Sequence, residues 1–444
     1  MLHKGMLKIQ VFKGNSYIPV EGSKVSVIQE KEGSSREIIQ NLTTDSSGLT
    51  NEIELEAPPI DNSMNPSDKS PYSLCNIIVD APRYKRLIIN GCQIYPNITS
   101  TQPCNLEPIN IRQGSEKVLN ISPNKLVGNY PPKIPENLDL VLPTPPDLIL
   151  IGFGVVVPEL VVIHDGLPDS LANDYTQTFK HYIKNVASSE IYPTWSESTI
   201  RANIYAIVSF TLNRVFTEWY KAKGKNFHIT SSTAYDHAFS FGRNIFDNIS
   251  RIVDEIFTAY IKRPNKMHPL LAQYCDGIRV QCPGWLSQWG SKYLGDQGKT
   301  PFEILRAFYG PNITLDTAKI VKGIPTSYPG HTLTIGSKDG NVKFTQEFLN
   351  KISEHYPAIP KLIVDGIYGH NTKKAVTTFQ KIFKLPPTGD VDYATWYEIS
   401  NIYVGVTKMA ELRSSNYRSI ERKFIPPVLN NYNIPIVTYF EEEE

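Results

Sequence analysis

The chain has 444 residues, of which 45 are lysine or arginine and 44 are aspartate or glutamate, so its formal net charge is only +1. This balance excludes the strongly basic surface of a nucleic-acid-binding protein and gives no sign of a charged membrane-binding face. The length exceeds what one hydrophobic core usually serves, so we expect two to four domains in a multidomain α+β protein.

Residues 1–115 contain short runs in which apolar and polar side chains alternate. Examples are LKIQVF, KVSVIQ, EIELEA and NIIVDA, separated by turn-forming segments such as Asp45-Ser46-Ser47-Gly48. Several short alternating strands at this spacing predict an antiparallel β-sandwich, in which we interpret Asp45 as a turn former. The first residues enter this pattern without a continuous apolar stretch or a small-residue cleavage site, so we expect no secretory signal peptide.

Prolines are concentrated in residues 116–157, as in Pro131-Pro132 and Pro143-Thr144-Pro145-Pro146. Such a composition favours an extended, exposed linker that a protease can reach. The longest apolar run of the chain, Leu148 to Val157, is about half the roughly 20 residues that a membrane-spanning helix needs. We therefore expect no membrane span.

Residues 158–315 contain three helical patterns among shorter strand-like segments and loops. Apolar residues recur at helical spacing in residues 197–220 and again in residues 244–262. A third helix is indicated by Thr300-Pro301-Phe302-Glu303, a capping-box sequence with proline at the first helical position. We expect a central α+β domain here.

One carboxylate in this region, Glu190, stands at the end of a further helical run. Apolar residues recur at helical spacing from Phe179 to Ala187, and Pro193, which has no amide donor, ends the run. A carboxyl group among aromatic side chains has its charged form disfavoured, which raises its pKa and lets it hold a proton for delivery. A solvated glutamate at a helix end is the alternative interpretation.

The segment YIKNVASSEIYP, residues 182–193, resembles the catalytic segment of the stage II sporulation protein D family of peptidoglycan lytic transglycosylases. In that family a tyrosine, a run of small residues and a glutamate precede a proline-containing turn. The stretch from His164 to Tyr309 also resembles the core of the clostridial spore cortex-lytic enzymes, and this likeness extends over nearly the whole chain. The resemblance implies that Glu190 is the catalytic acid and base.

The number of carboxylates at the site bears on the reaction. Hydrolysis of a glycosidic bond ordinarily takes two carboxylates. In a lytic transglycosylase the C6 hydroxyl of muramic acid attacks C1 of the same sugar, so one residue can serve first as acid and then as base. A single convincing carboxylate therefore fits a lytic transglycosylase better than a hydrolase.

Five further residues are candidates for substrate binding. Asp236 and His237 fall where the sporulation family carries polar residues on the substrate side. Tyr274, Trp285 and Trp289 have rings that can stack on sugar faces, although aromatic residues of this kind are usually buried in a core.

We predict no cofactor and no metal site. Some members of the sporulation family bind zinc through cysteine and histidine near the segment that corresponds to residues 230–239, where this chain has no cysteine. Cys275 and Cys282 lack the paired spacing of a zinc site, so we expect a local disulfide or two free thiols. The total of five cysteines is odd, which argues against a fully paired disulfide framework.

Residues 331–405 resemble the type 1 peptidoglycan-binding module, a three-helix domain. The likeness rests on LIVDGIYGHNTKKAVTTFQKIFKLPPTGDVDYATWYEI, in which a turn, a helix, a second turn and a tryptophan follow in the order of that module. The helix is expected from Thr372 to Phe383, with Ala375, Val376 and Phe379 facing inward. Residues 406–444 form a mixed tail that ends in four glutamates.

Together these resemblances imply a spore cortex-lytic transglycosylase that is made as an inactive precursor. The β-sandwich is then a prodomain, and residues 116–157 contain the cut made by a subtilisin-like germination protease. The other partner implied is cortex peptidoglycan, whose glycan strands carry muramic acid or muramic lactam. The implied location is the spore cortex or the outer spore layers.

Two alternatives stay open from the sequence. One is an N-acetylmuramoyl-L-alanine amidase acting on the same polymer, which needs a metal ion or an activated nucleophile that no residue pattern here indicates. The other is a non-enzymatic wall-binding scaffold whose central domain has lost its activity.

Overall fold

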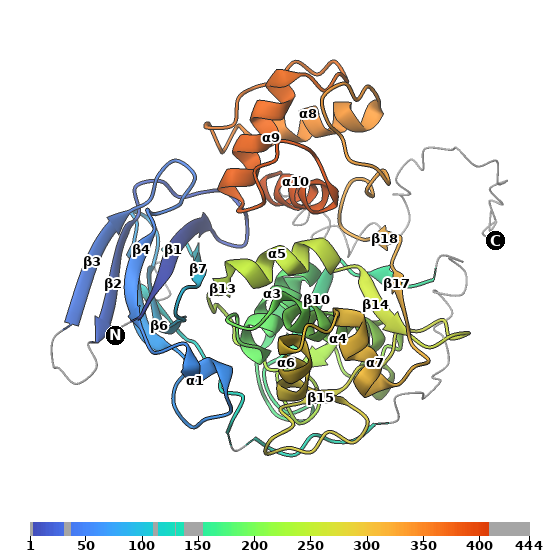
Figure 1. The fold of residues 1–444 in the computed structure, drawn as a ribbon. Coiled ribbons are helices and arrows are strands. Elements are labelled where there is room, and N and C mark those ends of the chain that lie inside the picture. The colour runs from blue at the N-terminus through green and yellow to red at the C-terminus, as the bar shows by residue number, and fades with distance from the viewer. Residues whose placement is uncertain (1–2, 31–36, 110–113, 129, 137–153, 408–444) are drawn as a thin grey trace, which may run out of the picture. The chain divides into compact units, whose positions relative to one another are not determined.

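The computed structural model describes residues 3–30, 37–109, 114–128, 130–136 and 154–407. Residues 137–153 of the predicted linker and nearly all of the predicted C-terminal tail lie outside this part. The described residues form a mixed α+β structure with several sheets and helices (Figure 1).

Two β-sheets make up most of the N-terminal region. One has five strands in the order β3-β2-β5-β6-β8, and the other has four strands in the order β13-β7-β1-β4. The strands are β1 His3–Lys13, β2 Lys24–Glu30, β3 Glu37–Thr43, β4 Ile53–Ala57, β5 Ser73–Asp80, β6 Arg86–Ile94, β7 Thr99–Leu106, β8 Glu116–Asn120 and β13 Ile245–Phe246, and the short helix α1 spans Asp61–Met64.

The alternating sequence pattern fixes which faces of these strands are buried. Along β5, Cys75, Ile77 and Val79 are buried while the residues between them are not, and buried side chains of both sheets form one hydrophobic cluster. The prediction of a wholly antiparallel arrangement is wrong, because β1 pairs with β7, and β6 with β8, in parallel. Alternation determines the buried face of a strand but is satisfied by either strand direction.

The turn predicted at Asp45 is confirmed. Its Oδ1 accepts hydrogen bonds from the backbone N–H groups of Ser47 at 2.8 Å and Leu49 at 3.0 Å. Gly48 has a φ of 71°, a conformation that glycine adopts without steric cost. Asp45 therefore holds the turn that leads from β3 of one sheet to β4 of the other.

Besides β13, the described residues of the central region contain six helical segments and nine short strands. The helices are α3 Phe179–Glu190, α4 Glu197–Phe216, η1 Lys221–Lys223, α5 Asp247–Ile256, α6 Gln288–Asp296 and α7 Pro301–Tyr309. The strands are β9 Val156–Val157, β10 Leu160–His164, β11 Asp174–Thr178, β12 Ile229–Thr230, β14 Ala259–Lys262, β15 Tyr274–Cys275, β16 Leu286–Ser287, β17 Thr314–Thr317 and β18 Ile320–Val321.

Helix α4 is apolar or small on almost every side and is buried along most of its length, as expected of a central core helix. The capping box of α7 is confirmed, because Thr300 and Glu303 each accept a backbone hydrogen bond from the other. The helix predicted over residues 244–262 is wrong at both ends. There β13 pairs with β7 and β14 pairs with β17, so β-branched and aromatic residues enter sheets instead.

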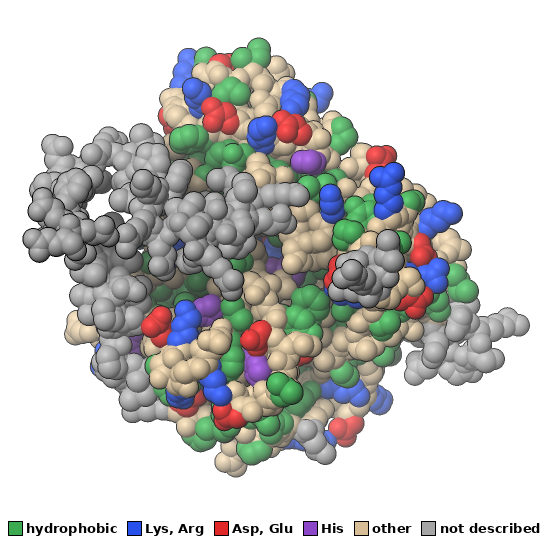
Figure 2. Space-filling model, turned by 180° about the vertical axis from the view of Figure 1, so that it is seen from behind, with side chains coloured by type: hydrophobic (Ala, Val, Ile, Leu, Met, Phe, Trp, Pro, Cys, Tyr) green, Lys and Arg blue, Asp and Glu red, His purple; other side chains and the backbone are tan. Residues whose placement is uncertain are grey.

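Three helices form the C-terminal part of the described chain: α8 Gly340–Ile352, α9 His370–Ile382 and α10 Tyr393–Val406. The side chains of Ala375, Val376 and Phe379 are fully buried, as predicted. No helix among the described residues is both long and apolar enough to cross a membrane. On the face drawn in Figure 2, basic and acidic side chains are interspersed, in keeping with the near-zero net charge.

Candidate functional site

Glu190 is the last residue of α3. The helix begins where the Thr178 hydroxyl accepts a hydrogen bond from the backbone N–H of His181. It ends because Ile191 is extended, with φ −133° and ψ 155°, two residues before Pro193. The predicted helix end is thus confirmed, and Glu190 lies where the chain turns away from the helix.

The carboxyl group of Glu190 is buried, with only 7% of the residue exposed. Its Oε1 accepts the backbone N–H of Ala238 at 2.6 Å, and its Oε2 accepts the side-chain amide of Gln288 at 3.2 Å. The Gln288 amide also donates to the backbone carbonyl of Glu190 at 2.8 Å. These contacts hold the carboxyl group in one orientation.

Burial raises the pKa of Glu190 above its ordinary value of 4.5, although the Lys133 cation and the donor groups of Ala238, Gln288 and Tyr274 act in the opposite direction. Burial wins because it disfavours the charged carboxylate more than these neighbours favour it. A carboxyl group in this state keeps its proton at a higher pH than a solvated glutamate does. It is suited to donate that proton to a bound substrate.

Glu190 opens onto a pocket of about 590 Å³, part of which is open to solvent. The central region supplies one part of the wall, including Glu190, Tyr274, Asp276 and Gln288. The chain between Pro123 and Lys133 supplies the other part.

Asp276 is a second carboxylate in the pocket wall that the sequence did not single out. It is 6% exposed, and its Oδ1 accepts the backbone N–H groups of Ile278, Arg279 and Val280 at 2.8 to 3.1 Å. Its Oδ2 is buried without a hydrogen-bond partner among the described residues. The Asp-Gly pair at residues 276–277 signals a turn, and a turn aspartate is easily taken for a purely structural residue.

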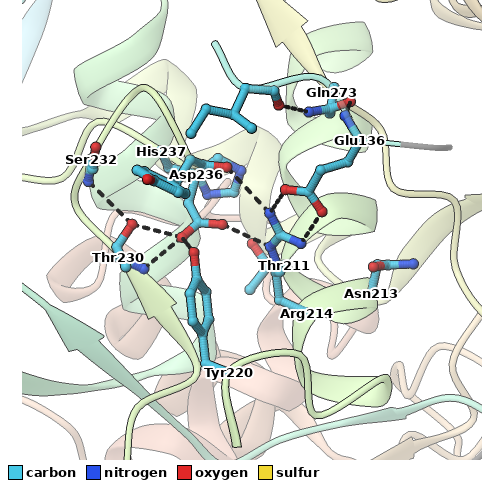
Figure 3. Close-up of polar contacts among 12 residues, drawn as sticks. Glu136, Thr211, Asn213, Arg214, Tyr220, Thr230, Ser232, Asp236, His237 and Gln273 are labelled. Carbon is cyan, nitrogen blue, oxygen red and sulfur yellow. Dashed lines mark hydrogen bonds and ion pairs between the residues drawn. The ribbon is translucent and has the colours of Figure 1, made fainter. Parts of the chain in front are cut away.

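The structure places the side chain of Asp236 in a buried polar network and not in the pocket wall (Figure 3). Its Oδ1 accepts Arg214 Nε at 2.7 Å. Its Oδ2 accepts the Tyr220 hydroxyl at 2.6 Å and both the N–H and the hydroxyl of Thr230, at 2.9 and 2.7 Å. Asp236 thereby fixes the backbone two residues before Ala238, whose N–H donates to Glu190.

His237 is also fully buried and outside the pocket wall. Burial, together with the nearby Lys133 and Arg214 cations, holds the pKa of His237 well below its usual range. The imidazole is therefore neutral, with Nδ1 2.9 Å from the Tyr182 hydroxyl and Nε2 without a partner in the described structure. Its ring stacks on Tyr274 at a centroid distance of 5.6 Å.

Of the three aromatic candidates, only Tyr274 lines the pocket. Its hydroxyl is buried without a well-oriented hydrogen bond to any described residue. Trp285 and Trp289 are 4% and 6% exposed, and Trp289 packs against Trp195 with ring centroids 5.1 Å apart. In this conformation the two tryptophans are core residues and offer no exposed ring to a sugar.

Sequence reasoning also missed Gln288 and Lys133. Gln288 opens α6 behind the capping residue Ser287, a position usually explained by helix capping alone. Lys133 lies in the proline-rich segment, and only the folded chain brings its amine to within 4.4 Å of the Tyr274 ring centroid.

The two cysteines beside this pocket are joined in a disulfide, Cys275–Cys282, one of the two states left open from the sequence. The bond closes the loop that contains Asp276. Cys75, Cys92 and Cys104 are free and buried. Within the described ranges, no group of three or more histidine, cysteine, aspartate or glutamate side chains is placed to hold a metal ion.

Comparison with protein-family models matches residues 338–399 to the family described as "Putative peptidoglycan binding domain". The chain carries a peptidoglycan-binding domain. The match contains α8, α9 and the first part of α10, in agreement with the resemblance seen in the sequence. No curated protein matches the chain.

In the peptidoglycan-binding domain, two buried glutamines each hold one turn by hydrogen bonds. Gln346 of α8 accepts the N–H of Gly366 at 2.9 Å and donates to Asp365 at 2.9 Å. Gln380 of α9 likewise accepts the N–H of Gly389 at 2.8 Å and donates to the carbonyl of Asp390 at 2.9 Å. Each glutamine fixes a loop that follows its own helix.

Proposed function

We propose that this chain degrades spore cortex peptidoglycan as a lytic transglycosylase, with a catalytic region like that of the stage II sporulation protein D family and an overall likeness to the clostridial enzyme SleC. The observation that carries the proposal is the buried carboxyl group of Glu190 at a pocket, with its pKa raised by burial, in a chain that also contains a peptidoglycan-binding domain. The domain brings the chain to the polymer, and Glu190 supplies the acid.

The proposed reaction consumes no water. Protonated Glu190 gives its proton to the glycosidic oxygen as the bond from C1 to that oxygen breaks. The resulting carboxylate takes the proton from the C6 hydroxyl of the same muramic acid, and the bond from O6 to C1 forms. Ala238 and Gln288 hold the carboxyl group in place through both steps, and Glu190 ends protonated, ready for another cycle.

The test is the Glu190→Gln variant, assayed by mass spectrometry of the muropeptides that it releases from cortex. Loss of a general acid typically lowers the rate by about 10²–10⁴-fold. Glu197→Gln is the matched control, because Glu197 lies on a neighbouring helix and pairs with Arg201 and Arg251 at the surface. Wall binding should be unchanged in both variants, and a fully active Glu190→Gln enzyme would sink the assignment.

A second candidate reaction is hydrolysis of the same glycosidic bond. It is favoured by Asp276, a second carboxylate in the pocket wall with one unpartnered oxygen, because glycoside hydrolases use two carboxylates. Under hydrolysis, Asp276→Asn loses activity and the products carry reducing ends. Under transglycosylation the products carry 1,6-anhydro-muramic acid and the Asp276→Asn variant still forms them.

The same product analysis separates the other possibilities. An amidase releases stem peptides from intact glycan strands, and a scaffold binds the wall and yields no product.

We also propose that the chain is made as a precursor and opened within residues 116–157 by a subtilisin-like germination protease in the spore cortex or the outer spore layers. The support is the resemblance to the cortex-lytic enzymes and the exposure of Pro131 and Pro132 in the described part of this segment. N-terminal sequencing of the form present during germination tests the proposal. A mature N-terminus outside residues 116–157 would refute it.

A further inference from the structure

The chain before residue 137 forms part of the wall of the pocket beside Glu190. Pro131 and Lys133 belong to the pocket wall, and both lie in the segment YPPKIPE, residues 130–136. With three prolines in seven residues, this 130–136 segment favours an extended conformation. Three of its residues, Tyr130, Pro131 and Lys133, line the same pocket as Glu190.

The backbone of the 130–136 segment is held from both sides. The N–H of Ile134 donates to the carbonyl of Ala234 at 2.8 Å. The side chain of Gln273 donates to the carbonyl of Ile134 at 3.1 Å and accepts the N–H of Glu136 at 3.3 Å. These contacts resemble those that a protein makes with a bound peptide.

Two charged side chains anchor the segment. The amine of Lys133 donates to the carbonyl of Asp236 at 2.9 Å and lies over the Tyr274 ring. The carboxylate of Glu136 forms a two-pronged ion pair with Arg214, at 2.8 Å to Nη1 and 2.6 Å to Nη2 (Figure 3). Paired hydrogen bonds of this kind are among the strongest and most direction-specific that proteins make.

The Arg214 guanidinium is fully buried and has two carboxylate partners of different origin. Asp236 belongs to the same region as Arg214 and accepts a hydrogen bond from its Nε. Glu136 belongs to the 130–136 segment and accepts hydrogen bonds from both terminal nitrogens. If the segment leaves, the terminal nitrogens keep one hydrogen bond among the described residues, to the carbonyl of Tyr235 at 3.3 Å, and the guanidinium keeps its contacts with the rings of Phe210, Trp219 and Tyr220. A buried cation in this state is a ready site for another carboxylate.

We propose that the 130–136 segment occupies the substrate groove, and that Arg214 binds a carboxylate of peptidoglycan in the place where Glu136 now lies. This inference rests on the proposed function and names the substrate more narrowly. The ligand is a muramic-acid-containing saccharide with a free carboxylate, on its lactyl group or on its stem peptide. Muramic lactam has no such lactyl carboxylate, because the lactam ring consumes it.

The test uses the full chain carrying Lys133→Met and Glu136→Gln together. The control carries Lys117→Met and Glu116→Gln, which change the same charges on the neighbouring strand β8. Amide hydrogen exchange over residues 130–136 should rise in the first variant and stay at the wild-type level in the control. Unchanged exchange in the first variant would overturn the anchoring roles of Lys133 and Glu136.

Binding of three soluble probes to the released variant then tests the groove by calorimetry. N-acetylmuramic acid carries the lactyl carboxylate, muramyl dipeptide carries a peptide carboxylate, and the chitin trimer carries none. At least one acidic probe should bind about tenfold more tightly than the trimer, since hydrogen bonds to a charged group are worth about 1.5–3 kcal/mol. The tighter of the two acidic probes identifies which carboxylate Arg214 binds.

Equal or absent binding of all three probes, in a variant whose 130–136 segment is released, would overturn the proposal. This readout does not depend on catalysis. Selective binding together with a fully active Glu190→Gln variant would leave the groove in place and refute only the proposed acid. Equal binding of the acidic and neutral probes, together with an inactive Glu190→Gln variant, would refute the carboxylate site and leave the proposed acid in place.

Discussion

Replacing Lys180 with methionine should destabilise the chain by about 3–5 kcal/mol, the cost of removing one partner from a buried ion pair. Lys180 lies on α3, the helix that ends at Glu190. Its amine is 2.8 Å from Asp254 of α5 and also contacts Glu398 of α10, and none of the three side chains is more than 9% exposed. Burial alone would lower the pKa of Lys180, but the two carboxylates raise it overall.

The loss falls unequally on the two carboxylates. Asp254 keeps the amine of Lys184 at 2.8 Å, whereas Glu398 has no second ion pair in the described part of the chain. A Lys180→Met/Glu398→Gln double variant should therefore recover part of the lost free energy, because it no longer buries a lone charge. Urea-induced unfolding measures all three states.

The matched control is Lys361→Met. Lys361 is 61% exposed and lies 3.9 Å from Glu354, so its replacement should change the free energy of unfolding by no more than about 0.5 kcal/mol. If Lys180→Met behaves like this surface variant, the buried ion pairs do not hold α10 against α3 and α5, and the reasoning is wrong.

Three further predictions concern pH, the disulfide and helix packing. Burial raises the pKa of Glu190, so the protonated acid is lost only as pH rises through that raised pKa. The alkaline limb of the pH profile of kcat/KM should therefore lie above 4.5. A limb at or below 4.5 contradicts the assignment. The Cys275→Ser/Cys282→Ser variant opens a loop with a sequence separation of 7. Its free energy of unfolding should fall by about 2.5 kcal/mol. An unchanged midpoint of urea unfolding would contradict this prediction. A Cβ at Gly295 would lie 2.0 Å from Thr199 Oγ1, whereas one at Gly340 meets nothing within 4 Å. Gly295→Ala should therefore lower the free energy of unfolding by about 1–3 kcal/mol, and Gly340→Ala should not. Thermal unfolding of the two variants measures the difference.

Local patterns predicted the features that local interactions decide. The Asp45 turn depends on hydrogen bonds within four residues. The α7 start depends on Thr300 and Glu303, three residues apart. The end of α3 follows from Pro193. In the peptidoglycan-binding domain, Gln346 and Gln380 tie each turn to a nearby helix, so a short sequence pattern specifies the domain.

Contacts between distant residues decided the features that were missed. The strand β13 forms because Ile245 and Phe246 pair with β7, nearly 150 residues earlier, where helical spacing alone had predicted a helix. The parallel pairing of β1 with β7 likewise depends on chain direction, which alternation does not record. The sequence suggested that Asp236 binds substrate, but its carboxylate accepts a hydrogen bond from the buried Arg214.

The 130–136 segment affects Glu190 in two ways that act together. It forms part of the wall of the pocket beside Glu190, and its Lys133 cation favours the charged form of Glu190, opposing the rise in pKa that burial causes. While the segment is in place, its cation makes the acid less able to hold its proton. When the segment leaves, Glu190 loses both the Lys133 cation and part of the wall that shields it from water, and Arg214 loses the carboxylate of Glu136. Departure of one short segment would thus widen the pocket beside Glu190 and free the proposed carboxylate site in a single step, so latency requires no distortion of Glu190 itself.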